Sequence, residues 1–161
     1  MTIILGLDPG SVYTGYGVIE HINGVTKALV CDRIACGRGD FPNRLEKLFN
    51  ELQKVIEEYK PHQAAIESVF VQKNAMSALK LGHARGVAMV VCALHQMPIS
   101  EYTPRQVKKA ITGYGAAEKS QMQFMIRATC KLAFTPSEDA ADALAVAITH
   151  AATLRHPALQ A

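Results

Sequence analysis

The stretch TIILGLDPGSVYTGYGVIEHINGVTKALVCDRIACG, residues 2–37, reads as three consecutive β-strands and decides the fold class. Its first run, TIILGL, is apolar and β-prone and stops at Asp8, which a Pro-Gly turn signature follows. The next two runs are separated by Asn23-Gly24, a strong signal for a tight hairpin turn. We therefore expect three antiparallel strands, with Asp8 at the end of the first.

The rest of the chain alternates helical and strand patterns. Apolar residues recur every three or four positions over residues 43–59, which indicates an amphipathic helix. The same reasoning predicts, in order, a strand over 63–69, helices over 74–97 and 104–113 with a strand over 99–102 between them, and helices over about 117–132 and 136–154. This order predicts an α/β fold in a single domain of residues 1–161, with a central mixed five-stranded sheet flanked by helices on both faces, as in the ribonuclease-H-like fold.

Composition excludes several classes of protein. Apolar residues make up 49% of the 161 residues, which favours a globular domain over a disordered chain. No apolar run approaches the roughly 18 residues that a membrane span needs, and the first residues lack a signal peptide, so we expect a cytoplasmic location and no membrane. The four cysteines form no CxxC pair and are expected to be free thiols.

Basic residues are concentrated in one part of the chain. Residues 68–137 contain nine Lys or Arg and only two acidic residues, a net charge of +7, whereas the remainder carries −4. Such a separation favours a surface for a polyanion, although solvated basic helices would give the same pattern.

Four carboxylates form the candidate active site. Asp139 and Asp142 are three residues apart in the last predicted helix, which places both on one helix face. The small residues around them would let this helix pack closely on the sheet, near Asp8 and near Glu67, which interrupts a buried strand. An oxygen-only ligand set suits Mg²⁺ or Mn²⁺, and two such ions would support phosphodiester hydrolysis.

Each carboxylate also has a purely structural interpretation. Asp8 could begin a turn, Glu67 could pair with a buried base, and Asp139 could interact with the helix dipole. The coincidence of two acids that each interrupt a buried strand pattern and two acids on one helix face favours the metal site. Our hypothesis is that Asp8 bridges two metal ions, and that Glu67 with Asp139 or Asp142 completes the coordination.

Several segments together resemble a known family, the RuvC Holliday-junction resolvases of bacteria. The resemblance spans nearly the whole chain and rests on LGLDPGSVYTGYGVIE, AIESVF, KNAMSALKLGHARGVA, EYTPRQVKKAITGYGAAEKSQ and EDAADALAVAITHA. It implies a homodimer that resolves four-way DNA junctions during recombination and repair by nicking two opposed strands symmetrically, with Mg²⁺ or Mn²⁺. The branch-migration proteins RuvA and RuvB are the partners it implies, and its catalytic residues match Asp8, Glu67, Asp139 and Asp142.

The resemblance also implies residues that contact DNA. Phe70 would stack on an unpaired base, although a core phenylalanine is the alternative, and the basic candidates are Lys73, Lys80, Arg85, Arg105, Lys108, Lys109 and Lys119. Residues 74–97 match the family's dimer-contacting helix, and the positions that would allow close approach of two subunits are Ala75, Ala78, Ala84 and Gly86. A helix buried in its own domain is the alternative.

Three other functions fit parts of the sequence. The sequence DPGS followed by TGYG is similar to a phosphate loop of sugar kinases and actin-like ATPases, but such enzymes need a second lobe that 161 residues do not provide. A silent junction-binding module would not require four intact carboxylates. Another nuclease on the same fold would share them, and only the matches at Phe70 and Lys119 favour a junction.

Overall fold

The structure, a computed structural model, describes residues 1–68 and 74–155 and contains the predicted mixed sheet. Its strands are β1 (Thr2–Asp8), β2 (Tyr13–Ile22), β3 (Val25–Ala35), β4 (Gln63–Glu67) and β5 (Ile99–Tyr102). They lie in the order β3-β2-β1-β4-β5. β2 runs antiparallel to both of its neighbours, β1 and β3, whereas β4 runs parallel to both β1 and β5. Parallel pairing brings the carboxyl ends of β1 and β4 to the same edge of the sheet.

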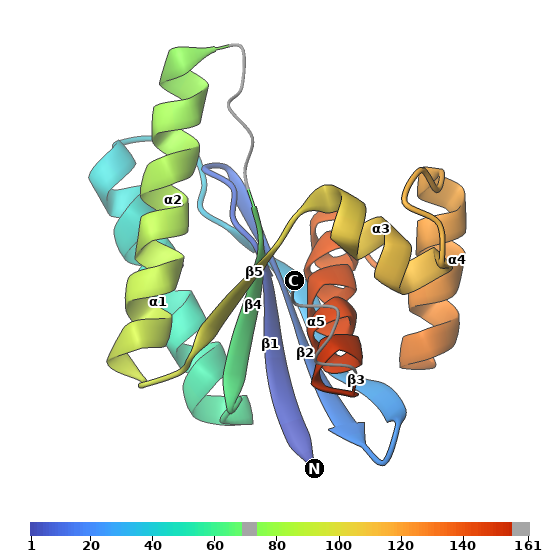
Figure 1. Cartoon of the computed structure of the whole chain (residues 1–161). Coiled ribbons are helices and arrows are strands. Elements are labelled where there is room, and N and C mark those ends of the chain that lie inside the picture. Colours follow the sequence, from blue (N-terminus) through green and yellow to red (C-terminus); the bar gives the residue numbers. More distant parts are fainter. Residues whose placement is uncertain (69–73, 156–161) are drawn as a thin grey trace.

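Helices cover both faces of this sheet, which confirms the predicted fold class. They are α1 (Phe41–Tyr59), α2 (Ala75–Leu94), α3 (Pro104–Thr112), α4 (Lys119–Cys130) and α5 (Glu138–Arg155). Figure 1 shows α1 and α2 on one side of the sheet and α3, α4 and α5 on the other. The predicted helix over 74–97 ends earlier, at Leu94, because Gln96 adopts a left-handed conformation with φ of 57°.

The alternation of side chains along each strand divides the core into two layers. Leu5 and Leu7 of β1 pack with α1 and α2 on one face. Ile4 packs on the other face with α5, so Gly6 and Asp8 also point toward α5. The period of two thus places Asp8 on the face that α5 covers.

Helix α5 lies unusually close to the sheet because glycines stand beneath it. A Cβ atom at Gly6 would lie 1.9 Å from the Ala143 carbonyl oxygen, and one at Gly15 would lie 2.0 Å from that of Asp139. Gly6 pairs across the strands with Gly17, which lies under Leu144. The expected close packing of this helix is confirmed, and it holds the first turn of α5 against the ends of β1 and β2.

We expect Gly6→Ala to lower the free energy of unfolding by about 3 kcal/mol, because the new methyl group has to displace the backbone of α5. Urea denaturation measures this change. Gly82→Ala is the matched control, since Gly82 has no heavy atom within 4 Å of its would-be Cβ and lies inside α2, where alanine should be neutral or stabilising. Equal stability of the two variants would contradict the close contact.

The four cysteines are free, as predicted. Cys36, Cys92 and Cys130 are buried, and Cys31 is partly exposed. Burial raises the pKa of the Cys92 and Cys130 thiols to about 12, which keeps both protonated near neutral pH. These thiols therefore act as small apolar groups in the core.

By length and composition, α2 is apolar enough to cross a membrane, the one such helix in residues 1–68 and 74–155. This corrects the expectation that no segment approaches that limit. One side of α2 is buried in the core through Ala84, Ala88, Val91 and Cys92. The exposed apolar residues of α2 lie together along a second side of the helix, different from the buried one. They are Met76, Leu79, Val90 and Leu94.

Candidate active site

Two of the predicted carboxylates meet at one edge of the sheet. Asp8 is the last residue of β1 and Glu67 the last residue of β4. The parallel register pairs Leu7 with Ile66, so its continuation by one residue places Asp8 beside Glu67. Ala65, two residues before Glu67, packs in the layer that contains α5. Both carboxylates therefore point toward α5.

The other two predicted carboxylates lie at the start of α5, over the same edge. Asp139 is in the first turn, together with Glu138, and Asp142 follows one turn later. The absence of a side chain at Gly15 lets the Asp139 backbone approach β2, where Gly15 pairs with Asp8. Negative charges near a helix N-terminus also interact favourably with the helix dipole.

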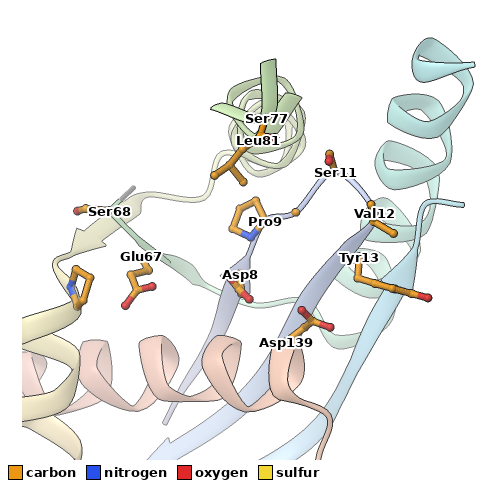
Figure 2. A pocket seen from close by; sticks show the side chains of 12 residues that line it. Asp8, Pro9, Ser11, Val12, Tyr13, Glu67, Ser68, Ser77, Leu81 and Asp139 are labelled. Atoms are coloured by element: carbon orange, nitrogen blue, oxygen red, sulfur yellow. The ribbon is translucent and has the colours of Figure 1, made fainter. Parts of the chain in front are cut away.

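Asp8, Glu67 and Asp139 line one cleft of about 590 Å³. Figure 2 shows Glu67 and Asp139 on either side of Asp8, with Ser77 and Leu81 of α2 on the opposite wall. Asp142 lines a neighbouring cavity of about 270 Å³, which also contains Glu67. Glu67 thus joins the two cavities, and all four acids surround one region.

Burial and mutual repulsion disfavour ionisation of Asp8, Glu67 and Asp142. The pKa of Asp8 rises from 3.8 to about 7, chiefly because of burial and then because of the charges on Asp142, Asp139 and Glu67. Burial and the charge of Asp142 also raise the pKa of Glu67, which Lys108 opposes. Asp142 as a whole is exposed to solvent, but its carboxyl group is partly shielded from water, and this burial raises its pKa. A bound cation would relieve this repulsion.

Two ion pairs partly neutralise the acidic region. Arg33 lies 3.6 Å from Asp139 between Nη1 and Oδ2, and Lys119 pairs with Glu138. Within residues 1–68 and 74–155, no three His, Cys, Asp or Glu side chains lie close enough to hold one metal ion. The oxygen-only donors fit a hard divalent cation in chemistry and charge, but their side chains have to converge to bind it.

A family model described as Crossover junction endodeoxyribonuclease RuvC matches residues 4–150. The chain belongs to the RuvC family. Proteins of that name from Photorhabdus laumondii and Saccharophagus degradans are 50% and 47% identical to it, and each match covers 93% of this chain and 87% of the relative. The structure of Thermus thermophilus RuvC in complex with a Holliday junction is similar at a TM-score of 0.93 and 28% identity, over 98% of this chain and 97% of that one. The resemblance and the ribonuclease-H-like fold are thus confirmed.

Two of the basic residues expected from the RuvC family line the second of these cavities. Lys108 and Lys119 line the cavity that contains Glu67 and Asp142. The candidates that are exposed to solvent on the helices are Lys80 in α2 and Arg105 and Lys109 in α3. Phe70 and Lys73 lie outside the described residues, so their roles stay predictions.

Arg85 has a different environment from the one expected of a DNA-binding residue. Its side chain is only 14% exposed, and its guanidinium donates to the Glu67 carbonyl oxygen and to the Glu101 carboxylate, both at 2.6 Å. Its hydrogen-bonding groups thus join α2 to the ends of β4 and β5. Arg85 therefore supports the strand that carries Glu67, and its expected DNA contact stays a prediction.

Three residues near the site were not anticipated from the sequence. Tyr13 lines the cleft, Glu138 adds a fifth acid at the start of α5, and Arg33 pairs with Asp139. Glu138 directly precedes Asp139 in the sequence, and this adjacency could have identified it as a further acid of the site. No local pattern pointed to Arg33, which reaches the site from the edge strand of the sheet.

Proposed function

We propose that this chain is a junction-resolving endonuclease, which nicks two opposed strands of a Holliday junction during recombination and repair. The observation that carries the proposal is that Asp8, Glu67, Asp139 and Asp142 line two neighbouring cavities of a RuvC-family fold. The similar Thermus thermophilus structure, a complex with a Holliday junction, supports the choice of substrate.

In the proposed mechanism the four carboxylates would hold divalent cations, Mg²⁺ or Mn²⁺, with two ions per site. When bound, such ions activate a water molecule and stabilise the leaving oxygen of the phosphodiester. Asp8 has the most central position, between Glu67 and Asp139, and would hold a cation together with these neighbours. Lys108 and Lys119 line the second cavity and would bind phosphates of the strand being cut.

Symmetric nicking requires two active sites, which a homodimer would provide. The exposed apolar side of α2, formed by Met76, Leu79, Val90 and Leu94, is the surface we propose for dimer contact. Ala84 does not belong to it, because this residue is fully buried in its own domain, which corrects its expected role. Association with RuvA and RuvB and a cytoplasmic location are proposed from family membership alone.

The decisive experiment compares nicking of a labelled four-way junction, a linear duplex and an RNA-DNA hybrid, each with Mg²⁺ and with EDTA. We expect paired, symmetric cuts in the junction only, and only with metal. Binding without cutting would favour a silent junction-binding module. Cleavage of the hybrid would instead indicate another nuclease on the same fold.

Lys119→Ala is expected to weaken junction binding and to reduce its salt dependence. Removing one ammonium group from a phosphate lowers the slope of log affinity against log salt by about 0.9. Fluorescence anisotropy between about 50 and about 200 mM salt measures this slope. Lys54→Ala is the matched control, because Lys54 also pairs with a glutamate, Glu51, but on α1, on the other face of the sheet. Equal slopes for the two variants would contradict a phosphate contact at Lys119.

A further inference from the structure

Arg33 occupies a position that links the metal site to the surface available to DNA. In the sheet, Asp8 pairs with Gly15 of β2, and Gly15 pairs with Arg33 of β3. Directly paired residues point to the same face, so Asp8 and Arg33 both face α5, on either side of a glycine. Asp139 lies over that glycine, between the two.

Two contacts hold the Arg33 guanidinium at the edge of the cleft. Nη1 lies 3.6 Å from Oδ2 of Asp139, and Cζ lies 4.2 Å from the centroid of the Tyr13 ring. Tyr13 and Asp139 both line the cleft. The Arg33 side chain is 44% exposed, so it remains accessible to a ligand that enters there.

The pairing of Arg33 with Asp139 competes with metal binding. A carboxylate that coordinates a divalent cation loses most of its attraction for a guanidinium, because the cation neutralises its charge. Arg33 would then lack its anionic partner while the Tyr13 ring still held it beside the cleft. In a substrate complex, a DNA phosphate would be the anion available to replace Asp139, because phosphate oxygens match the guanidinium in geometry.

We propose that Arg33 is a phosphate-binding residue that Asp139 holds until a divalent cation binds, so that metal binding and DNA binding are coupled. The proposal rests on the proposed nuclease function, because it takes Asp139 as a metal ligand. It assigns to Asp139 a second role, that of controlling the availability of Arg33. By linkage, DNA bound through Arg33 also favours the metal-bound form.

The test measures binding of a labelled four-way junction by anisotropy, in EDTA and with Ca²⁺ in place of Mg²⁺, on strands verified to be intact. For Arg33→Gln we expect an affinity within about twofold of the original chain in EDTA and about tenfold weaker binding in Ca²⁺, the effect of removing one charge-assisted hydrogen bond. Arg33→Lys should recover most of the affinity in Ca²⁺. Lys27→Gln removes the same charge from the same strand, at its other end, and should show no metal-specific loss.

A second readout uses no DNA. Removal of the competing guanidinium should tighten Ca²⁺ binding to Arg33→Gln severalfold, as measured by calorimetry or by the rise of the melting temperature with Ca²⁺. Weaker Ca²⁺ binding would show that Arg33 positions Asp139 for the metal, and would overturn the proposal. An equal loss of junction affinity in EDTA and Ca²⁺, or no loss in either, would also overturn it.

The same titrations on a linear duplex separate this proposal from the proposed function. Arg33 would bind a phosphate, which every duplex offers, so the metal-dependent loss should appear on both substrates. If the original chain shows no preference for the junction while the coupling persists, the proposed function fails and the role of Arg33 stands.

Discussion

Replacement of Asp8 by asparagine should lower the rate of junction cleavage by about a thousandfold or more and leave junction binding in EDTA within about twofold. Asp8 lies between Glu67 and Asp139 in the cleft, so its loss removes the carboxylate best placed to bridge two cations. Apart from Arg33 on β3, the described basic residues proposed to bind phosphates lie on α2, α3 and α4, which the substitution does not touch. Single-turnover cleavage and anisotropy on the same labelled junction measure the two quantities separately.

Asp32→Asn is the matched control for this experiment. Asp32 directly precedes Arg33 in β3, so its carboxylate lies on the opposite face of that strand. Its removal should therefore leave the rate of cleavage nearly unchanged. Cleavage retained by Asp8→Asn would refute the assignment of Asp8 as a metal ligand. Loss of binding as well as cleavage would place Asp8 in the DNA-binding surface instead.

The second large effect concerns stability, because the active site is expected to destabilise the metal-free fold above neutral pH. The pKa of Asp8 is 3.8 as a free group and about 7 in the folded chain, so the folded chain holds this proton more tightly. Ionisation of Asp8 therefore does not affect the free energy of unfolding below about pH 4. As the pH rises from there, the destabilisation of the folded chain grows, and it is complete above about pH 7. At about 1.4 kcal/mol for each tenfold change in proton affinity, ionisation of Asp8 costs the fold about 4 kcal/mol.

Asp8→Asn should remove most of this cost. In EDTA at about pH 8 the variant should unfold with a free energy higher by about 4 kcal/mol, or a melting temperature higher by roughly 10 °C. The difference should shrink as pH falls to about 4, and also when Mg²⁺ neutralises the carboxylates of the original chain. Denaturation curves across this pH range test the prediction, and a variant less stable than the original chain at about pH 8 would contradict it.

Much of the site could be predicted from local patterns. A carboxylate that interrupts an apolar strand pattern is visible along the chain, and it identified Asp8 and Glu67, although the structure ends β4 at Glu67. The three-residue spacing of Asp139 and Asp142 likewise placed both on one helix face. Arg85 shows the limit of this reasoning, because its basic character suggested DNA contact while its actual partners lie 16 and 18 residues away in the chain.

The sequence by itself determined the strands, the helices and the four carboxylates, since alternation, helical spacing and turn residues are properties of neighbours along the chain. Only the tertiary structure decided which side chains share the cleft. Between Ile22 and Val25 the hairpin begins in simple register, and an uninterrupted ladder would bring Asp32 opposite Gly15. A β-bulge at Val18/Ile19 shifts the register by one residue and brings Arg33 there instead. Because side chains alternate with a period of two, that single extra residue places a cation, and not a further acid, beside Asp139.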